Sequence, residues 1–85
     1  MSLKVKQGVK VRPERFGALV FTNRTPILAF NHDAYEIWKQ IDGRRDLEEI
    51  ADNLACRFGL TKEEVYPKVK EFMDACINLD LLARE

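Results

Sequence analysis

The 85-residue sequence contains few of the side chains that perform chemistry. It has one histidine and two cysteines, and its four glycines are scattered along the chain. A metal site or a nucleophilic active site needs several such side chains at close spacing, and a phosphate-binding loop needs clustered glycines. We therefore expect this chain to hold no metal and no cofactor, and to have no enzymatic activity.

The sequence also lacks an excess of charge of either sign. Fourteen Lys and Arg residues balance fourteen Asp and Glu residues, so the formal net charge is zero. Proteins that bind nucleic acid usually carry a basic surplus. This balance disfavours a nucleic-acid partner.

Long apolar runs are absent as well. No stretch reaches the length that a membrane span requires, and the lysine-rich start lacks the apolar centre of a signal peptide. These absences predict a cytoplasmic protein with no membrane partner. In that compartment Cys56 and Cys76 are expected to stay reduced, as partly buried thiols within helices.

Short apolar runs between turn residues predict strands in the first third of the chain. Residues 1–8 have little apolar weight and are expected to be loose, or to form a strand only if something pairs with them. Residues 9–12 alternate apolar and basic side chains, and Pro13 is expected to end this strand. A turn leads to a second strand at residues 18–22, and a third follows at residues 26–31.

The third predicted strand, Pro26 to Asn31, contains no charged residue. If this strand lies at a sheet edge, its unpaired backbone N–H and C=O groups are available to another chain. An extended peptide can add to such an edge as one more strand. We interpret this edge as the feature around which the rest of the chain is organised.

The remainder of the chain predicts three amphipathic helices. The first starts after the N-cap Asn31, places Trp38 in the core and stops at Gly43. The second and third begin at Asp46 and Thr61, each followed three residues later by a glutamate, as in a capping box.

The second helix is expected to bury a stripe that ends at Phe58, before Gly59 stops the helix. In the third helix, Pro67 lies about six residues past the cap, where proline disturbs a helix. The sequence leaves open whether Pro67 kinks this helix or splits it into two.

The apolar residues of the third helix cover more than one stripe. The main stripe comprises Val65, Val69, Phe72, Cys76 and Leu79. A flank comprises Tyr66, Met73 and Ile77. Two interpretations stay open: other elements cover this flank, or it remains open as one wall of a groove rimmed by charged residues such as Lys68.

The order of elements, β-β-β-α-α-α, predicts a single α+β domain at residues 9–85. A three-stranded, mostly antiparallel sheet is followed by three helices. The last two form a helix-turn-helix, so the domain is similar to a winged helix whose hairpin has moved to the front.

This ordered set of features resembles the PqqD-like family, whose small domains recognise the leader peptides of ribosomally made, post-translationally modified peptides. The resemblance covers about residues 9–82. Its marks are Arg12-Pro13, Phe30-Asn31, Asp42-Gly43, Glu49-Ile50 with Leu54, and Val69 with Phe72. Within the family, residues 11–21 are most similar to the leader-binding protein of mycofactocin systems.

The resemblance implies a non-catalytic adaptor that binds the leader of a precursor peptide by strand addition. The adaptor presents that peptide to a modifying enzyme, commonly a radical S-adenosylmethionine (radical SAM) maturase, to which the iron–sulfur cluster and the cofactor belong. The peptide-binding residues implied by position are Pro26, Ile27, Leu28, Ala29, Phe30, Lys68, Phe72, Met73, Cys76 and Leu79. Lys68 and Asp80 depart from the family, which often has an acidic residue and a glycine at these positions.

Two other functions compete with this one. The helix-turn-helix favours a winged-helix DNA-binding protein, but the third helix mixes lysines with acidic residues, whereas phosphate contacts need several Lys or Arg. A homo-oligomeric interaction module, such as a homodimer, would pair the free strand edge with its own copy. Self-association of this kind is compatible with peptide binding.

Overall fold

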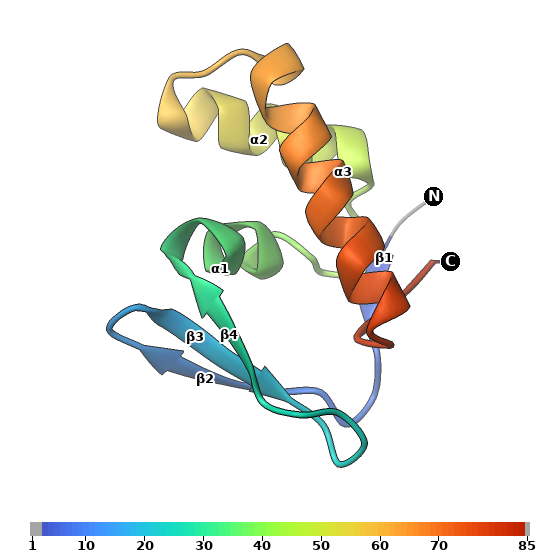
Figure 1. Cartoon of the computed structure of the whole chain (residues 1–85). Coiled ribbons are helices and arrows are strands. Elements are labelled where there is room, and N and C mark those ends of the chain that lie inside the picture. Colours follow the sequence, from blue (N-terminus) through green and yellow to red (C-terminus); the bar gives the residue numbers. More distant parts are fainter. Residues whose placement is uncertain (1–2, 85) are drawn as a thin grey trace.

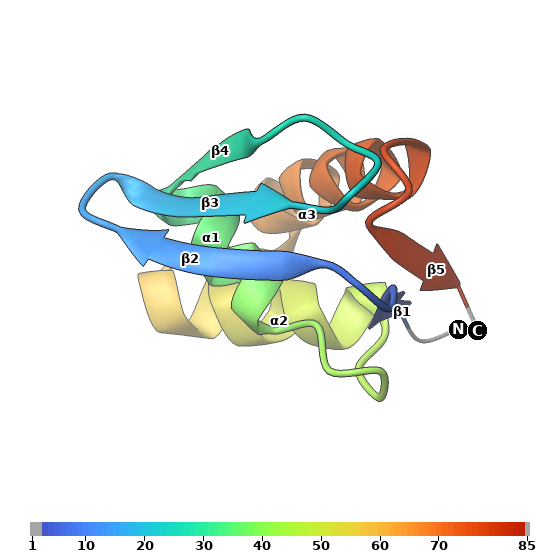
Figure 2. The ribbon, with the colours of Figure 1, turned by 90° about the horizontal axis from the view of Figure 1, so that it is seen from below.

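The computed structural model describes residues 3–84 and places three helices on one side of a three-stranded antiparallel sheet (Figures 1 and 2). The strands of this sheet are β2 (Lys10–Glu14), β3 (Gly17–Phe21) and β4 (Leu28–Asn31), in that spatial order. The helices are α1 (His32–Lys39), α2 (Leu47–Phe58) and α3 (Lys62–Asn78). The predicted α+β class, with three sheet strands followed by three helices, is confirmed.

The bounds of all three sheet strands differ from the prediction; β3 is shifted by one residue at each end, and β2 also starts one residue later. β2 continues through Pro13 to Glu14. Proline is tolerated there because β2 lies at the edge of the sheet, where an outward-facing N–H is not needed. β4 begins only at Leu28, so Pro26 and Ile27 belong to the loop that precedes it.

A second, two-stranded sheet joins the two ends of the described chain. β1 (Leu3–Val5) pairs antiparallel with β5 (Leu82–Arg84). Of the two alternatives for the first segment, loose or a strand when something pairs with it, the structure shows the second at residues 3–5; residues 1–2 lie outside the described residues. Burial accounts for the pairing, since the side chains of Leu3 and Leu82 are only 5% and 1% exposed.

The helix starts follow the capping residues. The Asn31 side chain accepts a hydrogen bond from the third residue of α1, Asp46 caps α2, and Thr61 forms a complete capping box on α3. One predicted helix end is wrong. α1 stops at Lys39, and Gly43 takes its positive φ of 81° in the loop beyond.

The structure answers one open question about the later helices and corrects one prediction. α3 runs unbroken through Pro67, whose side chain is exposed. Phe58 is 47% exposed, so its predicted burial is wrong. As the last residue of α2, it lies where the left-handed Gly59 turns the chain away from the core.

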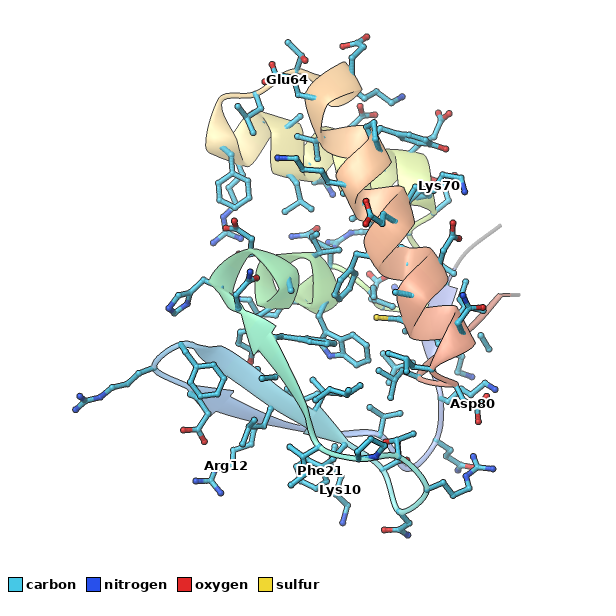
Figure 3. All side chains as sticks on the ribbon, viewed as in Figure 1. Lys10, Arg12, Phe21, Glu64, Lys70 and Asp80 are labelled. Atoms are coloured by element: carbon cyan, nitrogen blue, oxygen red, sulfur yellow. The ribbon has the colours of Figure 1, made fainter. Side chains whose placement is uncertain are left out.

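The core fills the space between the sheet and the helices, and Trp38 belongs to it as predicted. Its larger members include Val20, Phe30, Trp38, Ile50, Leu54, Val69, Met73 and Leu81. The opposite face of the sheet carries no helix. Figure 3 shows Lys10, Arg12 and Phe21 projecting from that face, away from α1 and α3.

Candidate functional site

The packing of β3 against β4 determines which way the backbone of β4 faces. Gly17 starts β3 with a φ of 144°, and a Cβ there would collide with the carbonyl oxygen of Phe30. That carbonyl therefore points into the space between β3 and β4. The register agrees. The pair Glu14 and Gly17 closes a two-residue turn, so their backbone groups face each other, and those of the next residue, Ala18, face Phe30. Phe30 thus directs its backbone polar groups toward β3.

Backbone polar groups alternate in direction along an antiparallel strand. Since Phe30 faces β3, Leu28 also faces β3, and Ala29 between them faces the free edge. Among the described strands, only β3 pairs with β4. The N–H and C=O of Ala29 are therefore open to a partner, and the Ala29 side chain is exposed.

Helix α3 lies beside this edge. The ring of Phe72 meets the ring of Phe30 edge-on at a centroid distance of 5.2 Å. Lys68, Phe72, Ala75 and Leu79 are spaced by four, three and four residues, so they share one stripe of the helix. Because Phe72 directs this stripe toward β4, we call the outward backbone edge of Ala29 and the four stripe residues the β4–α3 surface.

The structure brings four of the ten residues implied by the resemblance to this surface: Ala29, Lys68, Phe72 and Leu79. Ile27 is 66% exposed and Leu79 is 41% exposed, which is unusual for such apolar side chains. Pro26 and Lys68 are also exposed, and Phe72 is half-buried. Leu28 is half-buried and Phe30 is buried, with its ring in the core.

Met73 and Cys76 do not lie on the β4–α3 surface. Each is 2% exposed and belongs to the core. Burial raises the pKa of the Cys76 thiol to about 12, so it stays protonated near neutral pH. These two side chains pack in the core, and neither belongs to the β4–α3 surface.

Sequence reasoning missed Ala75 and Gly17. Ala75 is exposed on the stripe between Phe72 and Leu79. The helical spacing from Lys68 is the signal that would have found it, but one methyl group adds little to an apolar pattern. The importance of Gly17 depends on β4, which the local sequence does not contain.

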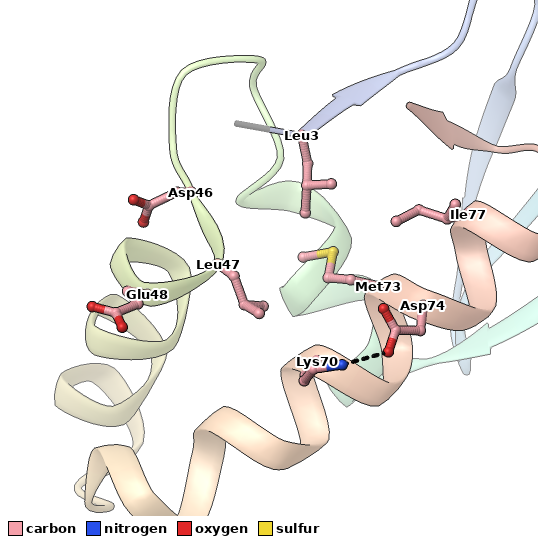
Figure 4. Close-up of a pocket in the computed structure, with 8 residues that line it drawn as sticks. All are labelled: Leu3, Asp46, Leu47, Glu48, Lys70, Met73, Asp74 and Ile77. Carbon is pink, nitrogen blue, oxygen red and sulfur yellow. Dashed lines mark hydrogen bonds and ion pairs between the residues drawn. The ribbon is translucent and has the colours of Figure 1, made fainter. Parts of the chain in front are cut away.

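The flank formed by Tyr66, Met73 and Ile77 faces away from β4. Met73 and Ile77 line a pocket of about 440 Å³ on the opposite side of α3 (Figure 4). The start of α2 and Leu3 of β1 form its other walls. The flank thus borders a pocket, but one next to α2 and not next to the free strand.

No metal site or membrane span emerges from the described residues. Within residues 3–84, no three His, Cys, Asp or Glu side chains gather closely enough to hold a metal ion. The helices of this same region are too short or too polar to cross a membrane.

Comparison with known proteins gives the family. The family model described as "Coenzyme PQQ synthesis protein D (PqqD)" matches residues 17–82. No curated protein sequence matches the chain.

Two solved structures share the fold. "TbiB1 in Complex with the TbiA(beta) Leader Peptide" aligns with a TM-score of 0.84 and 18% identity, covering 96% of each chain. The PqqD truncation of Methylobacterium extorquens PqqCD aligns with a TM-score of 0.81 and 15% identity, covering 96% of this chain and 88% of that one. That truncation is described as a functional, stand-alone recognition element for ribosomally synthesised and post-translationally modified peptides.

The fold and the open strand edge define a small α+β domain of the winged-helix-like kind, with one sheet edge available beside a helix. Within that class the chain belongs to the PqqD family, since the family model covers well over half of it.

Proposed function

We propose that this protein binds the leader segment of a ribosomally made precursor peptide and presents it to a modifying enzyme. Membership of the PqqD family supports this function. So do the two structural neighbours, one solved with a leader peptide and one described as a recognition element for such peptides. The adaptor acts by binding and performs no chemistry of its own.

The observation that carries the proposal is the open, uncharged edge of β4 beside α3. The N–H and C=O of Ala29 point outward, and the exposed apolar side chain of Leu79 lies on the stripe of α3 that faces β4. A strand edge supplies main-chain hydrogen bonds to any extended peptide, and the neighbouring side chains supply specificity.

In this mechanism the peptide becomes a fourth strand. A peptide residue opposite Ala29 exchanges two main-chain hydrogen bonds with it, each worth about 0.5–1.5 kcal/mol. Alternate peptide side chains then face α3, where Phe72, Ala75 and Leu79 favour an apolar residue. The ammonium group of Lys68 at the end of the stripe favours an acidic one.

The modifying enzyme is, on the family resemblance, a radical SAM maturase. That enzyme holds the iron–sulfur cluster and the cofactor. The adaptor's contribution is to raise the local concentration of the precursor at the enzyme.

A matched pair of proline variants tests the strand-addition mechanism. Ala29→Pro removes the outward N–H of β4 and places a ring at the open edge. We expect at least a tenfold loss of affinity for the leader of the precursor peptide encoded beside this gene, on the order of one lost hydrogen bond plus the steric cost. The measurement is an amide NMR titration.

The control is Val11→Pro on β2, the opposite edge of the same sheet. Val11 is separated from Pro13 by one residue, so its N–H also points away from β3. We expect its leader affinity to stay within about twofold of the unmodified protein. Circular dichroism verifies that both variants fold. Equal affinities for two folded variants would contradict strand addition at β4.

A further inference from the structure

One face of the three-stranded sheet is not covered by any helix. Side chains alternate between the two faces, so Leu19 and Phe21 lie opposite the buried Ala18 and Val20. Across the strands, Leu19 lies between Arg12 and Ala29, and Phe21 lies opposite Lys10. We call the six residues that share this face the outer sheet face: Lys10, Arg12, Glu14, Leu19, Phe21 and Ala29. None of them belongs to the core cluster, and the helices lie on the other side (Figures 2 and 3).

This face combines an apolar centre with two basic side chains and one acidic side chain along β2, so its surplus is one positive charge. Leu19 and Phe21 are half-buried, and the long stems of their cross-strand partners are placed to cover them. Arg12 is 72% exposed and shares an ion pair with Glu14 at 2.6 Å. Lys10 is exposed and has no ion pair with another described residue.

Basic and acidic residues are also unevenly distributed along the whole chain. Residues 1–31 contain six Lys and Arg residues but a single Asp or Glu. Residues 32–85 contain eight Lys and Arg against thirteen Asp and Glu. The zero net charge therefore hides a basic first segment and an acidic second one, and ion pairs from Lys6 and Arg24 to Asp80 join the two. A basic surface steers an acidic partner into contact.

We propose that the outer sheet face binds an acidic surface of the enzyme that modifies the bound peptide. This inference rests on the proposed function. A peptide added beside Ala29 continues the sheet, so alternate peptide side chains stand on the outer face next to Ala29. An enzyme seated on this face therefore contacts the adaptor and the peptide together, and it recognises the loaded adaptor in preference to either component.

A charge reversal on this face is the test. Lys10→Glu reverses the charge of a side chain that has no described ion pair to lose. Arg44→Glu makes the same change at an exposed position in the loop between α1 and α2, away from the sheet. Each variant is loaded with the leader peptide, and its affinity is measured for the purified modifying enzyme encoded beside this gene.

We expect Lys10→Glu to weaken enzyme binding about fivefold or more at low ionic strength, with the difference shrinking as salt screens the charges. Its leader affinity should stay within about twofold, because β4 is untouched. Arg44→Glu should leave both affinities within the same range.

Three outcomes overturn the inference. In the first, the loaded adaptor does not bind the enzyme. In the second, Lys10→Glu binds the enzyme as well as the unmodified protein does. In the third, the protein alone forms concentration-dependent oligomers that Lys10→Glu abolishes, which would assign the face to the acidic segment of a second copy. Failure of the proposed function is distinguishable, since the unmodified protein would then not bind the leader at all.

Discussion

The two edges of the three-stranded sheet differ in how they meet solvent. β2 carries Lys10, Arg12 and Glu14, and it contains Pro13. β4 contains no charge and no proline. Charges and proline on an edge strand discourage pairing with another chain. The same small sheet thus has one protected edge and one that is open for pairing.

The position of Pro13 sharpens this difference. Pro13 lies opposite Ala18, whose own partner on the other side is Phe30. Since Ala18 directs its backbone polar groups toward Phe30, the nitrogen of Pro13 faces away from β3. Proline therefore removes an N–H from the free edge of β2 without removing a hydrogen bond from the sheet. The corresponding position on β4 is Ala29, which keeps its N–H.

The largest expected effect comes from breaking the attachment of β4. In Gly17→Ala the new Cβ meets the carbonyl of Phe30 and the backbone of Asn31, all on the β4 side. We expect a loss of about 3 kcal/mol or more in the free energy of unfolding, because backbone atoms cannot yield as a side chain can. Urea denaturation measures it.

Gly8→Ala is the control for this substitution. Gly8 has a φ of 87°, but no atom lies within 4 Å of the position that a Cβ would occupy there. We expect a cost of only about 1 kcal/mol, from the backbone conformation alone. Equal losses for the two variants would show that the close approach of β3 and β4 is not what requires glycine at position 17.

A second substitution removes the protection of β2. Pro13→Val restores an N–H at the free edge of β2, and we expect self-association that increases with protein concentration. Size-exclusion chromatography with light scattering measures this effect. Urea denaturation serves as the control, because losing a proline alone changes stability by about 0.4–1 kcal/mol. A variant that stays monomeric at every concentration would assign the protection of β2 to its charges alone.

The contrast between the two edges is partly visible in the sequence. The absence of charge between Pro26 and Asn31, and the capping residues Asn31, Asp46 and Thr61, are local signals, and the structure follows them. Such features depend on residues within one turn of each other, so a single sequence specifies them.

Features that depend on distant residues could not be predicted in this way. β1 and β5 are three-residue strands from opposite ends of the chain, and neither has a periodic pattern of its own. The orientation of α3 is similar. Apolar side chains cover much of the circumference of this helix. The contact between Phe30 and Phe72 shows which of its sides faces β4. For that reason the sequence pattern cannot separate the buried Met73 and Cys76 from the residues of the β4–α3 surface.

The smallest expected effect concerns the loop that leads into β4. Asp80 forms ion pairs with Lys6 and, at 3.3 Å, with Arg24 of this loop. The hydrogen bond from Lys6 is the main cause that lowers the pKa of Asp80 below its usual value of 3.8. A carboxylate whose pKa is lower in the folded state stabilises the fold above its unfolded pKa, and that stabilisation is lost as pH falls through the folded pKa.

Asp80→Asn should therefore be slightly less stable than the unmodified protein at neutral pH. The difference should begin to shrink near pH 4 and vanish only below the lowered pKa of the folded state. Asparagine tolerates the φ of 65° at this position, so the backbone is not expected to change.

Asp42→Asn is the matched control, because Asp42 also has a lowered pKa, caused mainly by backbone hydrogen bonds from Arg45 and Arg44. Both variants should show the acid dependence in urea denaturation. Only Asp80→Asn should also weaken leader binding, by up to about twofold, since it alone releases the loop that positions β4. Equal leader affinities for the two variants would mean that β4 is held by its pairing with β3 and needs no anchor in the preceding loop.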